Sequence, residues 1–209
     1  MPPHEIHPEP WTPGYKCRRV MFGERWRFGI ECELHDREWD PWGSREPYGS
    51  LWLWIDGHVI GNPDRAEQLH QAFSPFQSVI DCIGRKAAST VPGTSYLDKF
   101  DFITWVRFGE DEEFSAERWG AGEIEQLRGC SAEPFAIFPG GFSPFQDGWD
   151  AVLLEDEQSE TLVWRRWCGE TAETHELSFP PGEVSRIVSL ALDWFLPLQR
   201  SRFPGVQPN

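Results

Sequence analysis

The stretch YGSLWLWIDGHVIG at Tyr48–Gly61 constrains the fold more than any other part of this 209-residue chain. Two short apolar runs flank an Asp-Gly pair, which is the strongest short-range signal for a two-residue β-hairpin turn because both central residues of that turn need positive φ. A two-residue turn also sets the register of the two strands. The expected pairs are Ile55 with His58, Trp54 with Val59 and Leu53 with Ile60.

The first strand of this hairpin is apolar on both faces, because Trp52 and Trp54 point to one side and Leu51, Leu53 and Ile55 point to the other. Such a strand is more often interior than exposed, with a helix over one face. A helix is predicted to begin at Pro75, since SPFQ at Ser74–Gln77 has the pattern of a capping box with proline at the first helical position. We therefore expect Trp52 and Trp54 to be buried against that helix.

The remaining pattern predicts more strands than helices. In RFGIECELH, Arg27–His35, apolar and polar residues alternate as in a strand with one buried and one solvated face. A final helix is predicted from Val184 until Pro197 ends it. Further strands are predicted at Asp101–Phe108, Phe135–Phe138, Asp150–Asp156, Thr161–Trp167 and His175–Phe179. This order indicates an α+β fold, a mostly antiparallel β-sheet with two principal helices packed on it.

The chain is expected to form one domain. Five prolines in residues 1–14 predict a flexible Pro-rich arm, residues 15–198 a single α+β domain, and residues 199–209 a tail. No run of about eighteen apolar residues and no secretory leader is present, which favours a cytoplasmic protein with no membrane partner. The five cysteines lack any CxxC spacing, so they are interpreted as reduced structural thiols.

The net charge of −15 is uneven, because residues 105–209 carry 8 Lys and Arg against 19 Asp and Glu. A field of that sign repels nucleic acid and anionic membranes and steers basic partners toward the molecule. Two acidic runs, taken alone, are typical of solvated loops. Together with nearby tryptophans they are also a candidate protein interface. Its residues would be Glu110, Asp111, Glu112, Glu113, Glu155, Asp156, Glu157, Trp39 and Trp42.

Two other functions stay open. A small hydrolase or ligand-binding enzyme could use Glu31, Glu33, His35 and His58, although the alternation also makes the first three the solvated side of a strand. A carbohydrate-binding module could stack sugar rings on exposed Trp39, Trp42 and Trp119. The chain has no HExxH, Walker or GxSxG motif, so we predict no catalytic residue, no metal and no cofactor.

The order of several motifs resembles one known family. In sequence, these are FGIECEL, YGSLWLWIDGHVIG, a helix, FSPFQDGWDAVLLED, TLVWRRW and ETHELSFPPGEVSRIV. This layout is similar to that of the immunity protein 42 family of bacterial polymorphic toxin systems, over about Phe22 to Phe195. The residues that carry the resemblance are Gly29, Glu31, Gly49, Trp54, Gly57, Gly61, Trp149, Glu176 and Pro181-Gly182.

The resemblance implies a cytoplasmic antidote that binds and neutralises a cognate toxin domain and is not an enzyme. Many toxins of such systems are nucleases with basic clefts. The acidic charge of this chain would then steer it toward a basic partner. The resemblance brings with it no catalytic residues, and it implies no nucleic-acid partner.

Overall fold

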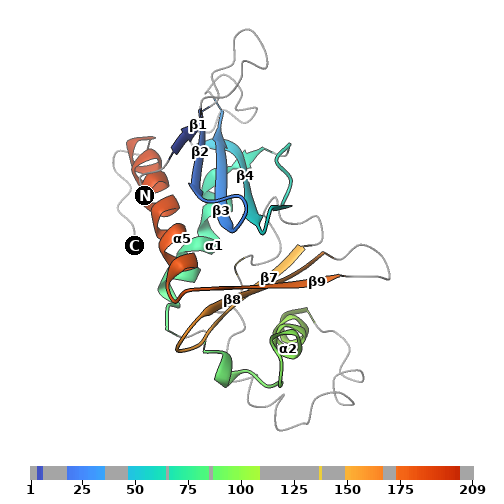
Figure 1. Cartoon of the computed structure of the whole chain (residues 1–209). Helices are drawn as coiled ribbons and strands as arrows, with labels where there is room; N and C mark the ends of the chain where they lie inside the picture. The colour runs from blue at the N-terminus through green and yellow to red at the C-terminus, as the bar shows by residue number, and fades with distance from the viewer. Residues whose placement is uncertain are drawn as a thin grey trace. The chain divides into compact units, whose positions relative to one another are not determined.

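The computed structural model describes residues 4–6, 18–35, 47–64, 66–84, 87–108, 137, 149–166 and 173–202 (Figure 1). The chain divides into two compact units, one of residues 1–77, 140–147 and 184–209 and one of residues 78–139 and 148–183. Each unit contains one antiparallel sheet. The predicted α+β class is confirmed, but the strands form two sheets where the sequence suggested one.

The sheet of the first unit has six strands in the order β1-β2-β3-β4-β5, and β6 also pairs with β4. The predicted hairpin is its β4–β5 pair, with the expected register of Ile55 on His58, Trp54 on Val59 and Leu53 on Ile60. Asp56 and Gly57 have φ of 50° and 78°, as the turn requires. The strands are β1 (His4–Ile6), β2 (Arg18–Gly23), β3 (Phe28–Leu34), β4 (Tyr48–Ile55), β5 (His58–Ile60) and β6 (Glu67–Gln68).

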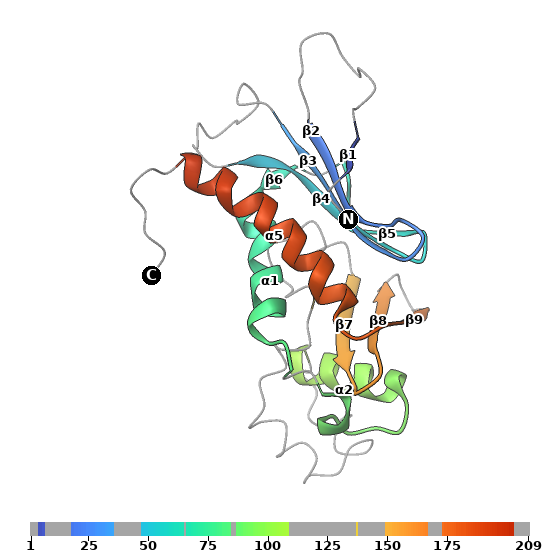
Figure 2. The same ribbon diagram turned by 60° about the vertical axis from the view of Figure 1, so that its left-hand side comes forward.

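Two helices, α1 (Leu69–Asp81) and α5 (Glu183–Arg202), pack together on one face of this sheet through their residues in the first unit (Figures 1 and 2). Phe73 of α1 stacks on Phe195 of α5 with ring centroids 4.2 Å apart. Phe22 of β2 contacts Trp194 of α5 at 5.7 Å between centroids. The buried apolar residues of β2, β3 and β4 that share this face with Phe22 are Val20, Phe28, Ile30, Cys32, Leu51, Leu53 and Ile55.

The predicted burial of Trp52 and Trp54 against a helix is therefore wrong. In the register of β3 with β4 they pair with Glu31 and Gly29, so they lie on the face opposite to α5. Trp52 is buried and Trp54 is half-buried there. The periodicity of a strand that is apolar on both sides does not tell which face receives a helix and which receives polar partners.

Pro75 was predicted to begin a helix and Pro197 to end one, and both predictions are wrong. Pro75 lies inside α1, which begins at Leu69, and Pro197 lies inside α5, which continues to Arg202. Proline cannot donate to the carbonyl four residues earlier. In α1 the Ser74 hydroxyl donates to that carbonyl, of Gln71, at 3.2 Å and replaces the missing bond. In α5 the residue four positions earlier is Asp193, which is exposed.

The second unit contains a three-stranded sheet in the order β7-β8-β9. The strands are β7 (Trp149–Glu155), β8 (Glu160–Arg166) and β9 (Thr174–Phe179), close to the predicted bounds. A 3₁₀ turn, Ala88–Thr90, and the helix α2 (Tyr96–Phe108) also belong to this unit (Figure 2). Its core contains Ala88, Val91, Phe100, Phe102, Ile103, Val152, Leu154 and Val163.

Residues Asp101–Phe108 were predicted as a strand, but they are the end of α2. The run DFITWVRF is rich in apolar and β-branched residues, which favours a strand locally. A capping box upstream decides against it: Ser95 Oγ accepts from the Asp98 amide at 3.1 Å, and the Asp98 carboxylate accepts from the Ser95 amide at 3.0 Å. Once the helix begins at this cap, Phe100, Phe102 and Ile103 are all buried.

We predict that Asp98→Ala lowers the free energy of unfolding by about 1 kcal/mol at neutral pH, the usual cost of a lost cap. Hydrogen bonds from Ser95 and then Thr94 lower the pKa of Asp98 from 3.8 to about 2. A carboxylate with a lowered pKa stabilises the fold above its ordinary pKa and loses that contribution as the pH falls toward 2.

The difference between the parent and Asp98→Ala in urea unfolding should therefore shrink below about pH 4. Asp98→Glu is the matched control, because glutamate at this position also completes a capping box. An Asp98→Ala difference that stays constant from pH 7 to pH 2.5 would contradict the assigned role of the carboxylate.

Several smaller expectations also change. Residues 4–6 of the predicted arm form β1, and residues 67–68, for which no strand was predicted, form β6. Of Phe135–Phe138 only residue 137 is described, and its amide donates to the Ala151 carbonyl at 3.2 Å. Cys32 is a buried free thiol, and burial followed by the charge of Glu33 raises its pKa. Among the described residues, no helix has both the length and the apolar character needed to cross a membrane.

Candidate functional site

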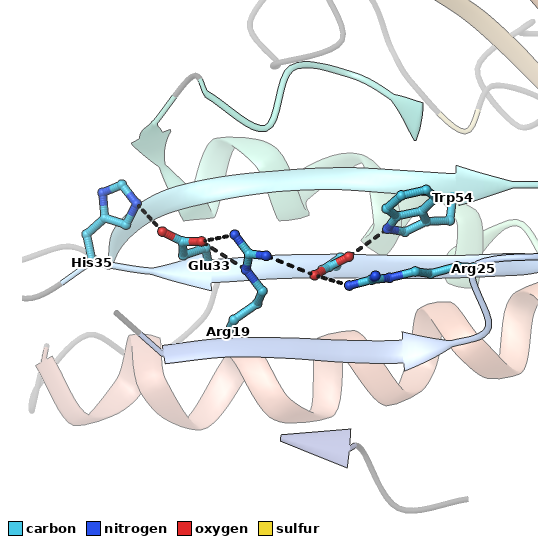
Figure 3. A network of polar contacts seen from close by, with 6 residues as sticks. Arg19, Arg25, Glu33, His35 and Trp54 are labelled. Carbon is cyan, nitrogen blue, oxygen red and sulfur yellow. Dashed lines mark hydrogen bonds and ion pairs between the residues drawn. The ribbon is translucent and has the colours of Figure 1, made fainter. Parts of the chain in front are cut away.

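A network of charged and aromatic side chains covers the face of the first sheet opposite to α5 (Figure 3). At its centre Glu31 of β3 is fully buried. One carboxylate oxygen of Glu31 accepts from Arg25 at 2.9 Å, and the other accepts from the indole Nε1 of Trp54 at 2.7 Å. The guanidinium of Arg19 lies 3.7 Å from the first oxygen. The buried charge is thus compensated by two arginines and one neutral donor.

A second carboxylate extends the network along β3. Glu33 accepts from Nε and from a terminal nitrogen of Arg19 at 3.0 and 2.6 Å. The imidazole Nε2 of His35 lies 3.5 Å from the other Glu33 oxygen. Arg19 therefore bridges the two glutamates, and Figure 3 shows the continuous chain of contacts from His35 through Arg19 to Arg25 and Trp54.

Each arginine of the network also lies over a tryptophan ring. The guanidinium carbon of Arg19 is 5.3 Å from the Trp52 ring centre, and that of Arg25 is 5.0 Å from the Trp54 ring centre. Cation–π contacts of this geometry add to the ion pairs. The carboxylates contact the two guanidinium groups from one side, and the indoles contact them from another. The side chains of both arginines and both tryptophans are therefore held in fixed orientations.

The alternation of β3 explains why Glu31 and Glu33 share this face, and two glycines bring the neighbouring backbone close. A Cβ on Gly29 would lie 2.3 Å from the Met21 side chain. A Cβ on Gly49 would lie 2.0 Å from the Glu33 carbonyl oxygen. Real Cβ atoms do not approach this closely. At Gly49 the neighbour is backbone and cannot give way, so this position requires glycine, whereas at Gly29 the nearest atom is the movable end of the Met21 side chain. Gly29, Glu31, Gly49 and Trp54 are also residues on which the family resemblance rests.

The predicted solvated role of Glu31 is wrong, since this residue has no exposed surface. Of the four residues of the alternative enzyme site, Glu31, Glu33 and His35 lie in this one network, but His58 does not. His58 pairs with Ile55 on β4, so it lies on the face opposite to Glu31 and Glu33. Among the described residues, no group of three His, Cys, Asp or Glu side chains could hold a metal ion. A carboxylate whose two oxygens are both bonded and buried fits a structural role better than proton transfer to a substrate.

The acidic β7–β8 turn contributes contacts within its own unit. Glu155 accepts from the Gly84 amide at 2.9 Å. Asp156 accepts from the Tyr96 hydroxyl and from the amides of Gln158 and Ser159, and the bond from Tyr96 is the main cause of its lowered pKa. Glu157 is exposed. The other predicted interface residues, Glu110–Glu113, Trp39 and Trp42, and Trp119 of the carbohydrate alternative lie outside the described residues.

Sequence reasoning missed Arg19 and Arg25, which compensate Glu31. The signal that could have found Arg19 is RRVMFG at Arg18–Gly23, in which three consecutive apolar residues bounded by glycine are typical of a short strand. Pairing this strand with β3 places Arg19 directly opposite Glu33, a favourable cross-strand charge pair.

Comparisons with known proteins agree on one family. The model of the family described as immunity protein 42 matches residues 20–194, a range that includes Arg25, Glu31 and Trp54. No curated protein matches the chain significantly. The chain is similar to the crystal structure of CdiI from Burkholderia dolosa AUO158, with 14% sequence identity, a TM-score of 0.55, and coverage of 83% of this chain and 99% of that chain. At this identity the likeness shows a shared fold.

Proposed function

Because the chain belongs to the immunity protein 42 family, we propose that it is a cytoplasmic antidote that binds and neutralises a cognate toxin domain. The single observation that carries this proposal is the family match over residues 20–194. The fold shared with CdiI from Burkholderia dolosa AUO158 supports it. The partner is a protein, and the toxin would be inhibited by occupation of its surface.

The proposed inhibition is non-enzymatic and needs no cofactor. Glu31, the most buried charged residue of the candidate site, is bonded to Arg25 and Trp54 inside the protein, which supports a role in shaping the surface. A rigid, preorganised surface binds with a smaller entropy cost than one that orders on binding. The network therefore holds the side chains of a binding face in fixed positions.

The test is expression of the C-terminal toxin domain encoded next to this gene, with and without the chain. The toxin domain alone should arrest growth, and growth should return when the chain is produced in the same cells. The two purified proteins should form a stable complex, measured by size-exclusion chromatography with light scattering. A toxin domain that stays active and unbound in the presence of excess chain would refute the proposal.

The acidic charge of residues 105–209 supports a partner with a basic surface, such as the substrate cleft of a nuclease. Within the interface predicted from the sequence, Glu155 and Asp156 already have partners in their own unit, so mutating them would disturb folding as well as binding. Glu110–Glu113 is the better segment for a test of steering.

We predict that replacing Glu110–Glu113 by the corresponding amides slows association with the toxin domain and flattens its dependence on salt, while dissociation changes little. The measurement is the association rate at low and high salt. The control is Asp64→Asn with Asp193→Asn, which removes two exposed carboxylates elsewhere and gives the effect per charge. Equal rates and equal salt slopes for parent and variant would exclude residues 110–113 from steering.

A further inference from the structure

The tight turn between β2 and β3 exposes a tryptophan. Trp26 is 72% exposed, more than Ile83 and Leu97, the other large hydrophobic side chains that are exposed in the described part of the chain. A single exposed apolar residue is common on protein surfaces and does not by itself indicate a binding site. Its significance depends on how the turn is held and on what surrounds it.

Four backbone hydrogen bonds fix this turn. Within it, the Glu24 amide donates to the Phe28 carbonyl at 2.9 Å and the Arg27 amide donates to the Glu24 carbonyl at 3.2 Å. The neighbouring β4–β5 turn adds two more, from Asp56 to the Arg27 carbonyl and from Gly57 to the Arg25 carbonyl, each at 2.9 Å. Trp26 therefore projects from two hairpin turns bonded side by side. Little backbone freedom remains to be lost when its side chain binds a partner.

The side chains next to Trp26 extend the candidate site to the tip of the sheet. Arg25 is half-exposed, lies over the Trp54 ring and is held by Glu31 (Figure 3). Residues 18–27 contain four arginines and one glutamate, so this stretch is positive in a chain whose net charge is −15. Tryptophan and arginine are the residue types most enriched among the hot spots of protein interfaces.

We propose that the β2–β3 turn anchors the toxin interface: Trp26 enters an apolar pocket of the toxin domain, and carboxylates at the rim of that pocket accept hydrogen bonds from Arg25. This inference rests on the proposed function and deepens it. The acidic segments would steer the chain toward a basic surface of the toxin. The turn is itself basic, so it fits a different part of the toxin. Steering then sets the association rate, and the anchor sets the dissociation rate.

The test compares the parent with Trp26→Ala in binding kinetics with the cognate toxin domain. Loss of a hot-spot side chain should weaken the complex on the order of 30-fold, almost entirely through faster dissociation. Ile83→Ala is the matched control, because it removes an exposed apolar side chain that is not on this turn, and its kinetics should equal those of the parent. Trp26→Phe keeps an aromatic ring and should lie between parent and alanine variant.

The outcomes separate this inference from the proposed function. If the parent itself does not bind the toxin domain, the proposed function fails. If the parent binds and Trp26→Ala binds equally well with an unchanged thermal unfolding midpoint, the anchor is refuted while the antidote role stands. A parent that dimerises in analytical ultracentrifugation, with dimerisation lost and toxin binding kept in Trp26→Ala, would assign the turn to a second copy of the chain and also refute the anchor.

Discussion

The double variant Arg19→Ala with Arg25→Ala is expected to lose about 3–5 kcal/mol of unfolding free energy, the usual cost of stripping the partners from a buried charge. Glu31, which is fully buried in the parent, would then keep only the Trp54 indole as a donor in the network. Two half-exposed arginines can be rehydrated when they lose a carboxylate, but a buried carboxylate cannot, so removing the arginines is the more damaging change. Urea unfolding followed by circular dichroism measures the loss.

Adding Glu31→Gln to this double variant should recover part of the lost stability, because a neutral amide is much cheaper to bury than an unpaired carboxylate. Arg166→Ala with Arg186→Ala removes two exposed arginines and controls for the change in net charge. If the network double variant loses no more than this control, or if Glu31→Gln lowers its stability further, the buried carboxylate is not what the arginines stabilise.

The β4–β5 hairpin could be predicted to the residue because its information is local. Asp56-Gly57 specifies the turn, and the turn sets every pair of the short ladder. The β7–β8 pair was likewise found within one residue at each end, from two apolar runs separated by a short polar turn. Where a few consecutive residues decide the conformation, the sequence pattern was sufficient.

The network and α2 depend on information that is spread further along the chain. Whether Glu31 faces water or two arginines is decided by the pairing of β2 with β3, and β2 was not predicted. The alternation of β3 indicated which side chains share a face, but not that the face is closed by Arg19 and Arg25. For α2, a local strand preference was overruled by a cap that begins at Ser95, several residues before the apolar run.

Phe73→Ala is the second change with a large expected effect, again about 3–5 kcal/mol of unfolding free energy, because a buried phenylalanine leaves both lost apolar burial and a cavity. Phe73 is 1% exposed, and its ring stacks parallel to that of Phe195 and meets Phe76 edge-on at 5.8 Å. Phe73→Leu retains most of the apolar volume and should lose less than alanine. Ile83→Ala, at an exposed position after the end of α1, should change stability by less than about 0.5 kcal/mol. Phe73 lies in the first half of α1, before Pro75. A Phe73→Ala variant as stable as the parent would mean that the packing of this half of α1 against α5 does not stabilise the fold.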